Sequence, residues 1–225
     1  MTRTTNARLA GFTFLFYIAA GITSLVLFGR AASGEGIAAK LASIAQHATD
    51  VRVVVVLGLL QCFSALVLAV TLYAITREQD RDLAMLALTC RVAEGVISGI
   101  SIPETLGLLW LATATGANAP DPGAAHAVGA YLLRPPSEGV AVTATFFAVG
   151  STLFSWLLLR GRMIPVALAW LGVLASVLLV VGLPLQLAGV LRGLVTQLMW
   201  LPMAAFEIPL ALWLLIKGVA APATR

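Results

Sequence analysis

The chain has 225 residues, of which 60% are hydrophobic and only 11% are charged, and its net charge is +4. A soluble protein carries about 25% charged residues, so this composition excludes an ordinary soluble domain and indicates an integral membrane protein. The basic residues lie at the ends of apolar segments, where they fix topology and meet lipid headgroups, so the positive charge does not indicate nucleic-acid binding.

About six apolar segments long enough to cross a bilayer follow one another along the chain, and no stretch remains for a separate soluble domain. We therefore predict an all-α fold, a polytopic membrane helical bundle in which residues 1–225 form a single integral membrane domain. The predicted spans cover residues 9–29, 53–76, 83–113, 140–159, 164–190 and 195–216.

The connections and prolines add detail to this outline. The connection at 37–48 is mildly amphipathic and is expected to lie on the membrane surface. Pro103 interrupts the third span, and Pro202 and Pro209 are expected to kink the sixth. The segment 116–136 is rich in glycine, alanine and proline and is predicted to be the largest loop.

The distribution of lysine and arginine predicts the orientation. Eight of these residues lie at the N-terminus, the second–third turn, the fourth–fifth turn and the C-terminus, and five lie on the opposite side. Because the more basic side of a membrane protein normally faces the cytoplasm, both termini are expected to be cytoplasmic. An even number of spans agrees with this orientation.

Ionisable residues inside apolar sequence are the most informative ones. Arg91 and Glu94 lie in the third span and Glu207 lies in the sixth. At mid-bilayer such a charge costs about 2.5–3.5 kcal/mol on insertion scales, so it normally faces the bundle interior and has a partner. Arg91 and Glu94 are three residues apart and therefore share one helix face.

The three residues are also predicted to occupy one layer of the membrane. With a helical rise of 1.5 Å, Arg91 and Glu94 lie about 12 Å and about 16 Å from the start of their span, and Glu207 lies about 15 Å from the end of its own. We expect Arg91 to meet Glu207, Glu94 or both. One arginine cannot neutralise two carboxylates, so a bound proton or cation is expected there. The candidate ligand- or proton-binding residues are Arg91, Glu94, Glu207, Ser98, Ser101, Tyr17 and Gln61.

A second polar group is predicted on the outer side, where an Arg52–Glu104 ion pair is plausible. This outer-side polar cluster consists of Arg52, Glu104, His47 and Asp50. Histidines without cysteine or carboxylate spacing are weak evidence for a metal, so no metal site is predicted. The sequence also contains no nucleophile elbow, phosphate loop or haem-ligand pair, and neither a catalytic residue nor a cofactor is predicted.

Several short motifs in this order resemble a known family. The segments are Arg8-Leu9-Ala10-Gly11, Leu72-Tyr73, Arg91-Val92-Ala93-Glu94 and the run from Glu207 to Gly218. Over nearly its whole length the chain resembles the bacterial membrane-protein family catalogued as domain of unknown function 4386. The resemblance implies that Arg91, Glu94 and Glu207 belong to the family's pattern and that the protein lies in the bacterial cytoplasmic (inner) membrane. It implies no activity.

Three functions are consistent with these features. The first is a bundle that binds or moves a small or amphiphilic ligand at the polar intramembrane site, with coupling to protons. The second is a non-catalytic structural or partner-binding membrane subunit, in which the same three residues hold the helices together. The third is an intramembrane enzyme acting on a lipid, with Glu94 and Glu207 as acid and base. The expected partners are the bilayer itself and a small-molecule or lipid ligand.

Overall fold

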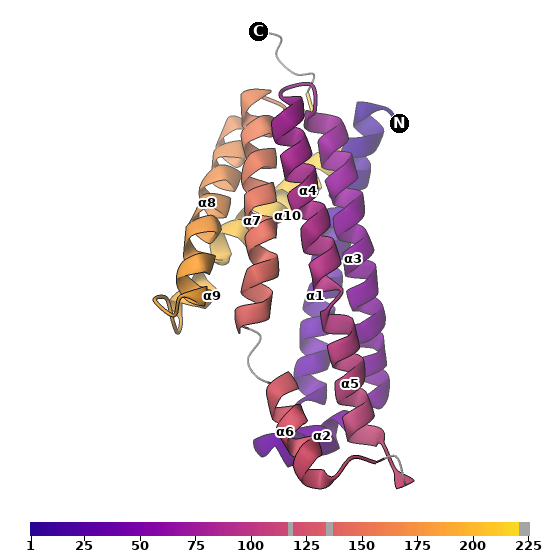
Figure 1. Cartoon of the computed structure of the whole chain (residues 1–225). Helices are drawn as coiled ribbons and strands as arrows, with labels where there is room; N and C mark the ends of the chain where they lie inside the picture. The colour runs from indigo at the N-terminus through magenta and orange to yellow at the C-terminus, as the bar shows by residue number, and fades with distance from the viewer. Residues whose placement is uncertain (117–118, 134–136, 221–225) are drawn as a thin grey trace. The chain divides into compact units, whose positions relative to one another are not determined.

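A computed structural model describes residues 1–116, 119–133 and 137–220, and all the regular structure in these ranges is helical (Figure 1). This confirms the predicted fold class. The helices are α1 (Arg3–Ala31), α2 (Gly36–Gln46), α3 (Ala48–Thr76), α4 (Arg81–Ser98), α5 (Ser101–Thr113), α6 (Pro122–Leu132), α7 (Ser137–Arg160), α8 (Val166–Leu187), α9 (Val195–Leu198) and α10 (Leu201–Ile216).

Six helical segments are long and apolar enough to cross a membrane, as the sequence predicts. These segments are Arg3–Ala31, Ala48–Thr76, Arg81–Thr113, Val140–Arg160, Val166–Leu187 and Val195–Ile216. Large apolar side chains such as Leu25, Val70 and Leu174 are exposed on them, which is the arrangement expected of helices that face lipid. The protein is therefore a multi-pass membrane protein.

Two of the predicted spans are broken where proline enters. The third span divides into α4 and α5 at Gly99 and Ile100, directly before Pro103. The sixth divides into α9 and α10 at Met199 and Trp200, directly before Pro202. A proline has no amide hydrogen and its ring crowds the carbonyl four residues earlier, so each helix restarts with the proline in its first turn.

The segment 116–136, predicted to be a loop, contains the helix α6. Asp121 caps this helix, because its carboxylate accepts a hydrogen bond from the backbone N–H of Ala124 at 3.1 Å. Pro122 follows at the first helical position, where a missing N–H carries no penalty. The Asp-Pro pair was the available signal, and the glycine-rich composition concealed it. The predicted helix at 37–48 is present as α2, and its place on the membrane surface stays a prediction.

The contacts within the chain form two compact units, whereas the sequence predicts a single domain, which stays a prediction. Unit 1 comprises Met1–Tyr17, Phe63–Ile97 and Ser137–Arg225. Unit 2 comprises Ile18–Cys62 and Ser98–Pro136. In unit 2, α2, α5 and α6 pack against one another, and Ile44, Val51 and Leu108 are buried in its core.

In unit 1, α7 and α8 form an antiparallel hairpin, and α10 packs against α8 (Figure 1). The core is built from large side chains such as Phe154, Leu179 and Phe206 together with many alanines. Gly11 of α1 lies against α10, where an added Cβ atom would approach the carbonyl oxygen of Ala211 to 2.6 Å. Small residues thus allow helix backbones to approach closely, as is usual in membrane bundles.

One end of unit 1 gathers four chain segments: the start of α1, the α3–α4 turn, the end of α7 and the end of α10. Arg3 pairs with Glu78 at 2.5 Å, and Arg160 pairs with Asp80 at 3.4 Å. Gly218, after α10, lies beside Thr4 of α1. The backbone N–H of Ala220 also donates to the carbonyl of Met163 at 3.0 Å. The start of α1 and residues 218–220 therefore lie at the same end of unit 1.

Candidate functional site

Arg91, in α4, is the largest of the fully buried side chains in the described part of the protein, with a relative exposure of 1%. Its neighbour on the same helix face is Glu94, and Nη1 of Arg91 lies 2.9 Å from Oε2 of Glu94. This confirms the predicted Arg91–Glu94 pairing. Burying both groups removes them from water, so their mutual attraction must offset a large desolvation cost.

Tyr17 of α1 connects a second helix to this pair. Its hydroxyl donates a hydrogen bond to Oε1 of Glu94 at 3.2 Å. Glu94 is thus held on one oxygen by Tyr17 and on the other by the charge of Arg91. The two contacts fix the carboxylate between α1 and the arginine of its own helix.

Helix α7 supplies the wall against which Arg91 packs. The guanidinium carbon of Arg91 lies 4.9 Å from the centre of the Phe147 ring, a cation–π arrangement. One turn later, a Cβ atom on Gly150 would come within 3.0 Å of Cγ of Arg91, so the absence of a side chain makes room for the arginine. The ring of Phe147 in turn packs on Trp200 with centroids 6.2 Å apart.

The guanidinium is poorly satisfied by its surroundings. Nε and Nη2 of Arg91 are buried and have no hydrogen-bond partner in the part of the chain that the structure describes. The contact from Nη1 to Glu94 is an ion pair whose angles do not meet those of a hydrogen bond. Arginine carries five N–H donors, and buried donors in native proteins are normally paired. The site therefore presents unused donors inside the apolar bundle.

Glu207 of α10 is the third ionisable residue near the Arg91–Glu94 pair. Its carboxyl lies within the electrostatic influence of both Arg91 and Glu94. It forms no ion pair with Arg91 within the described ranges, and its side chain is partly exposed. Arg91 was predicted to meet Glu207, Glu94 or both, and among the described residues the structure shows an ion pair with Glu94 alone.

The remaining predicted members of the set, Ser98, Ser101 and Gln61, belong to unit 2. The Ser101 hydroxyl donates to the carbonyl of Ser98 at 2.8 Å, a bond within the helical turn. The side chain of Gln61 on α3 lies close to Gly21 on α1. The structure therefore brings together Arg91, Glu94, Tyr17 and Glu207 in unit 1 and leaves the other three in a separate unit. The role of the whole set in ligand binding stays a prediction.

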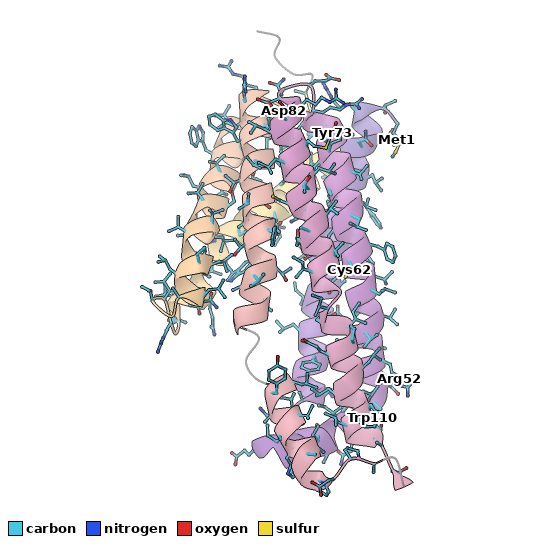
Figure 2. The ribbon with its side chains drawn as sticks, viewed as in Figure 1. Met1, Arg52, Cys62, Tyr73, Asp82 and Trp110 are labelled. Atoms are coloured by element: carbon cyan, nitrogen blue, oxygen red, sulfur yellow. The ribbon has the colours of Figure 1, made fainter. Side chains whose placement is uncertain are left out.

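The outer-side polar cluster also lies in unit 2 but does not form the predicted ion pair. Arg52 of α3 (labelled in Figure 2) and Glu104 of α5 are both exposed. Among the described residues neither has an ionic partner. Long charged side chains at a span end gain more from water and headgroups than from one exposed pair. The ring nitrogen Nδ1 of His47 lies 2.9 Å from the carbonyl of Ser43. Within the described ranges, no three His, Cys, Asp or Glu side chains are grouped closely enough to hold a metal.

Phe147 and Gly150 are site residues that the sequence reasoning missed. Both are uncharged, and the fourth predicted span contains no ionisable residue between Val140 and Leu159. The small residues that recur at helical spacing on α7 are Ala141, Ala144 and Ala148, and they lie on a different face from Gly150. No pattern in this apolar run therefore marked Phe147 or Gly150 as part of the site.

Comparison with known proteins supplies a family but no function. A family model described as a domain of unknown function (DUF4386) matches residues 9–218. The chain belongs to this family. No curated protein and no solved structure matches it. The DUF4386 match includes the whole of the site in unit 1, from Tyr17 to Glu207. Membership therefore adds no ligand or reaction to what the geometry supports.

The Arg91–Glu94 pair predicts a specific pattern of stabilities. Glu94→Leu leaves a buried guanidinium without its counter-charge and is expected to lower the free energy of unfolding by about 3–5 kcal/mol. The double variant Arg91→Met/Glu94→Leu removes both charges and is expected to regain most of that loss. Unfolding of the purified protein in mixed micelles measures both values.

Glu104→Gln, which changes an exposed carboxyl in unit 2, is the control and is expected to change the free energy of unfolding by less than about 0.5 kcal/mol. A Glu94→Leu variant as stable as the parent protein would contradict the pairing.

Proposed function

We propose that this DUF4386 protein binds a small or amphiphilic ligand with an acidic or other hydrogen-bond-accepting group at the intramembrane site around Arg91. The observation that carries the proposal is the pair of buried nitrogens, Nε and Nη2, without a hydrogen-bond partner in the described part of the chain. A buried donor left unpaired costs about 1–3 kcal/mol, and more when it is charged. An acceptor group that reaches these donors recovers that free energy.

Each side chain then has a role in binding. Arg91 presents its planar donors to the acceptor group, as arginine does for carboxylates and phosphates. Glu94 balances the arginine charge when the site is empty, and Tyr17 holds Glu94 in place. Glu207 adds a second carboxyl whose charge acts on the same arginine. Two carboxyls and one arginine already carry more acid than base, so an acidic ligand is expected to bind together with a proton.

The competing function is a non-catalytic structural subunit, in which the same residues hold the bundle together. It is favoured by two contacts that do link helices, Tyr17 on Glu94 and Arg91 on Phe147. The ion pair itself joins residues 91 and 94 of one helix and ties no two helices together. A purely structural role also has no use for a guanidinium with two unpaired nitrogens, because apolar residues would pack there at lower cost.

Ligand binding is tested by thermal unfolding of the purified protein with a panel of acetate, succinate, inorganic phosphate and oleate. A ligand at a hundred times its Kd stabilises the folded state by about 2.7 kcal/mol, so binding raises the unfolding midpoint. We expect at least one probe to do this, and we expect Arg91→Gln to weaken its affinity about tenfold or more. Arg91→Lys keeps the charge but loses the donor geometry, and is expected to weaken the same probe.

Two variants separate binding from general stability. Arg52→Gln removes an exposed arginine from unit 2 and is expected to leave probe affinity unchanged. Arg91→Met/Glu94→Leu is expected to fold yet to show no stabilisation by any probe. Ligand binding at Arg91 is wrong if every probe stabilises the parent protein, Arg91→Gln and the double variant to the same extent. It is also wrong if no probe stabilises the parent protein. Either result would favour the non-catalytic structural subunit.

We also propose that the protein lies in the bacterial cytoplasmic membrane with both termini in the cytoplasm. The end of unit 1 that holds the start of α1 and residues 218–220 also holds Arg3, Arg77, Arg81, Arg160 and Lys217. Basic residues concentrate on the cytoplasmic side of membrane proteins, which supports this orientation.

Cysteine labelling tests the orientation. In a background in which Cys62 and Cys90 are replaced by serine, single cysteines are introduced at Lys217 and, on the side predicted to be opposite, at Glu35. A membrane-impermeant maleimide is expected to label position 217 in inside-out vesicles and position 35 in right-side-out vesicles. The reverse pattern would invert the proposed orientation, and labelling of both positions from one side would rule it out.

A further inference from the structure

A cavity of about 390 Å³ lies at the end of unit 1 where α3 passes into α4. Its lining consists of Tyr73, Arg77, Glu78 and Arg81. Figure 2 labels Tyr73 and Asp82 at this end. The volume is within the range of small-molecule binding sites, about 300–1,000 Å³. The cavity is separate from the Arg91 site and shares no residue with it.

Not every charged side chain around the cavity has an ionic partner. Glu78 pairs with Arg3 at 2.5 Å, and Asp80 pairs with Arg160 at 3.4 Å, and both arginines come from other segments of unit 1. Arg77 and Arg81 are left without an ionic partner among the described residues, and Asp82, which does not line the cavity, is the one other acid of the turn. The cavity is therefore open to solvent and carries two exposed guanidinium groups that form no ion pair among the described residues.

Tyr73 provides a second, independent observation. Its ring is partly buried against the core of unit 1, while its hydroxyl makes no hydrogen bond to any residue that the structure describes. Two arginines and a phenolic O–H thus line the same space as donors without a protein acceptor. Oxygen-rich anions match such a set, and arginine is the side chain that recognises phosphate with paired hydrogen bonds.

The position of the cavity along the spans indicates which kind of anion would reach it. The second candidate span ends at Thr76 and the third begins at Arg81, so the lining residues lie where helices leave the hydrocarbon. Phospholipid headgroups occupy that level, and tyrosine is enriched there for the same reason. We propose that this cavity binds the phosphate-bearing headgroup of an anionic phospholipid. The acyl chains then lie along the exposed apolar surface of the adjoining spans, where Val70 is one such residue.

Native mass spectrometry of the full-length protein in a neutral detergent tests the assignment. The probes are phosphatidylglycerol and phosphatidylcholine with identical acyl chains. We expect phosphatidylglycerol to bind about tenfold more tightly, since each basic residue at an anionic headgroup adds appreciably to affinity. Arg77→Gln/Arg81→Gln is expected to reduce the affinity for phosphatidylglycerol to that for phosphatidylcholine. Tyr73→Phe removes only the hydroxyl and is expected to cause a smaller loss in the same direction.

The matched control removes two charges from the same end of unit 1 but outside the cavity. Arg162→Gln/Lys217→Gln is expected to keep the preference for phosphatidylglycerol, because neither residue lines the cavity, although both are exposed as Arg77 and Arg81 are. An unchanged preference in Arg77→Gln/Arg81→Gln, or an equal loss in the control, would overturn the proposal. Inorganic phosphate that competes as strongly as the lipid would assign the cavity to a free anion and overturn the lipid headgroup. None of these outcomes depends on the ligand of the Arg91 site.

Discussion

A guanidinium that stays charged inside an apolar bundle must be surrounded by groups that compensate for the water it has lost. In unit 1 this requirement organises three helices around Arg91. Glu94 supplies the opposite charge, Phe147 offers the face of its ring, and Gly150 leaves the volume that the arginine stem occupies. Tyr17 then fixes the carboxylate from a further helix. These residues would have little reason to lie together if position 91 were apolar.

The compensation is incomplete, and this supports the proposed binding site over a purely structural role for Arg91. A cation–π contact with Phe147 and an ion pair with Glu94 stabilise the charge but leave Nε and Nη2 of Arg91 without an acceptor in the described part of the chain. Membrane proteins place such costly groups where they face a pathway or a ligand. Membership of DUF4386 neither supports nor opposes this reading, because the family is defined without a function.

Arginines with unused donors occur at two depths of the same unit. Arg91 is buried in unit 1, whereas Arg77 and Arg81 are exposed at the ends of two candidate spans. The proposed ligand at both places is an oxygen-rich anion, but the surroundings differ. Water and counter-ions screen charges at the boundary and are excluded around Arg91, so the inner site is expected to discriminate more strongly between ligands.

The spans were predictable from sequence because hydrocarbon forces long apolar helices, and a run such as 53–76 has no other stable arrangement. The breaks before Pro103 and Pro202 followed from the lack of an amide hydrogen on proline. The pairing of Arg91 with Glu94 followed from helical spacing alone. Contacts between helices could not be predicted in the same way. Helix depth placed Glu207 level with Arg91 but could not fix whether the two side chains meet. No feature of the uncharged run 140–159 indicated that Gly150 would leave room for the arginine.

The proposed binding site depends on whether the buried donors of Arg91 remain without a protein acceptor when the protein is in a membrane. The most direct test is a density map of the protein in lipid nanodiscs at a resolution that shows ordered water. We expect Arg91 to contact Glu94 and to have density that is not protein, either water or a ligand, within hydrogen-bond distance of Nε and Nη2. A guanidinium whose five donors are all bonded to protein acceptors, in a dry and closed interior, would contradict the proposed site and leave Arg91 as an architectural residue.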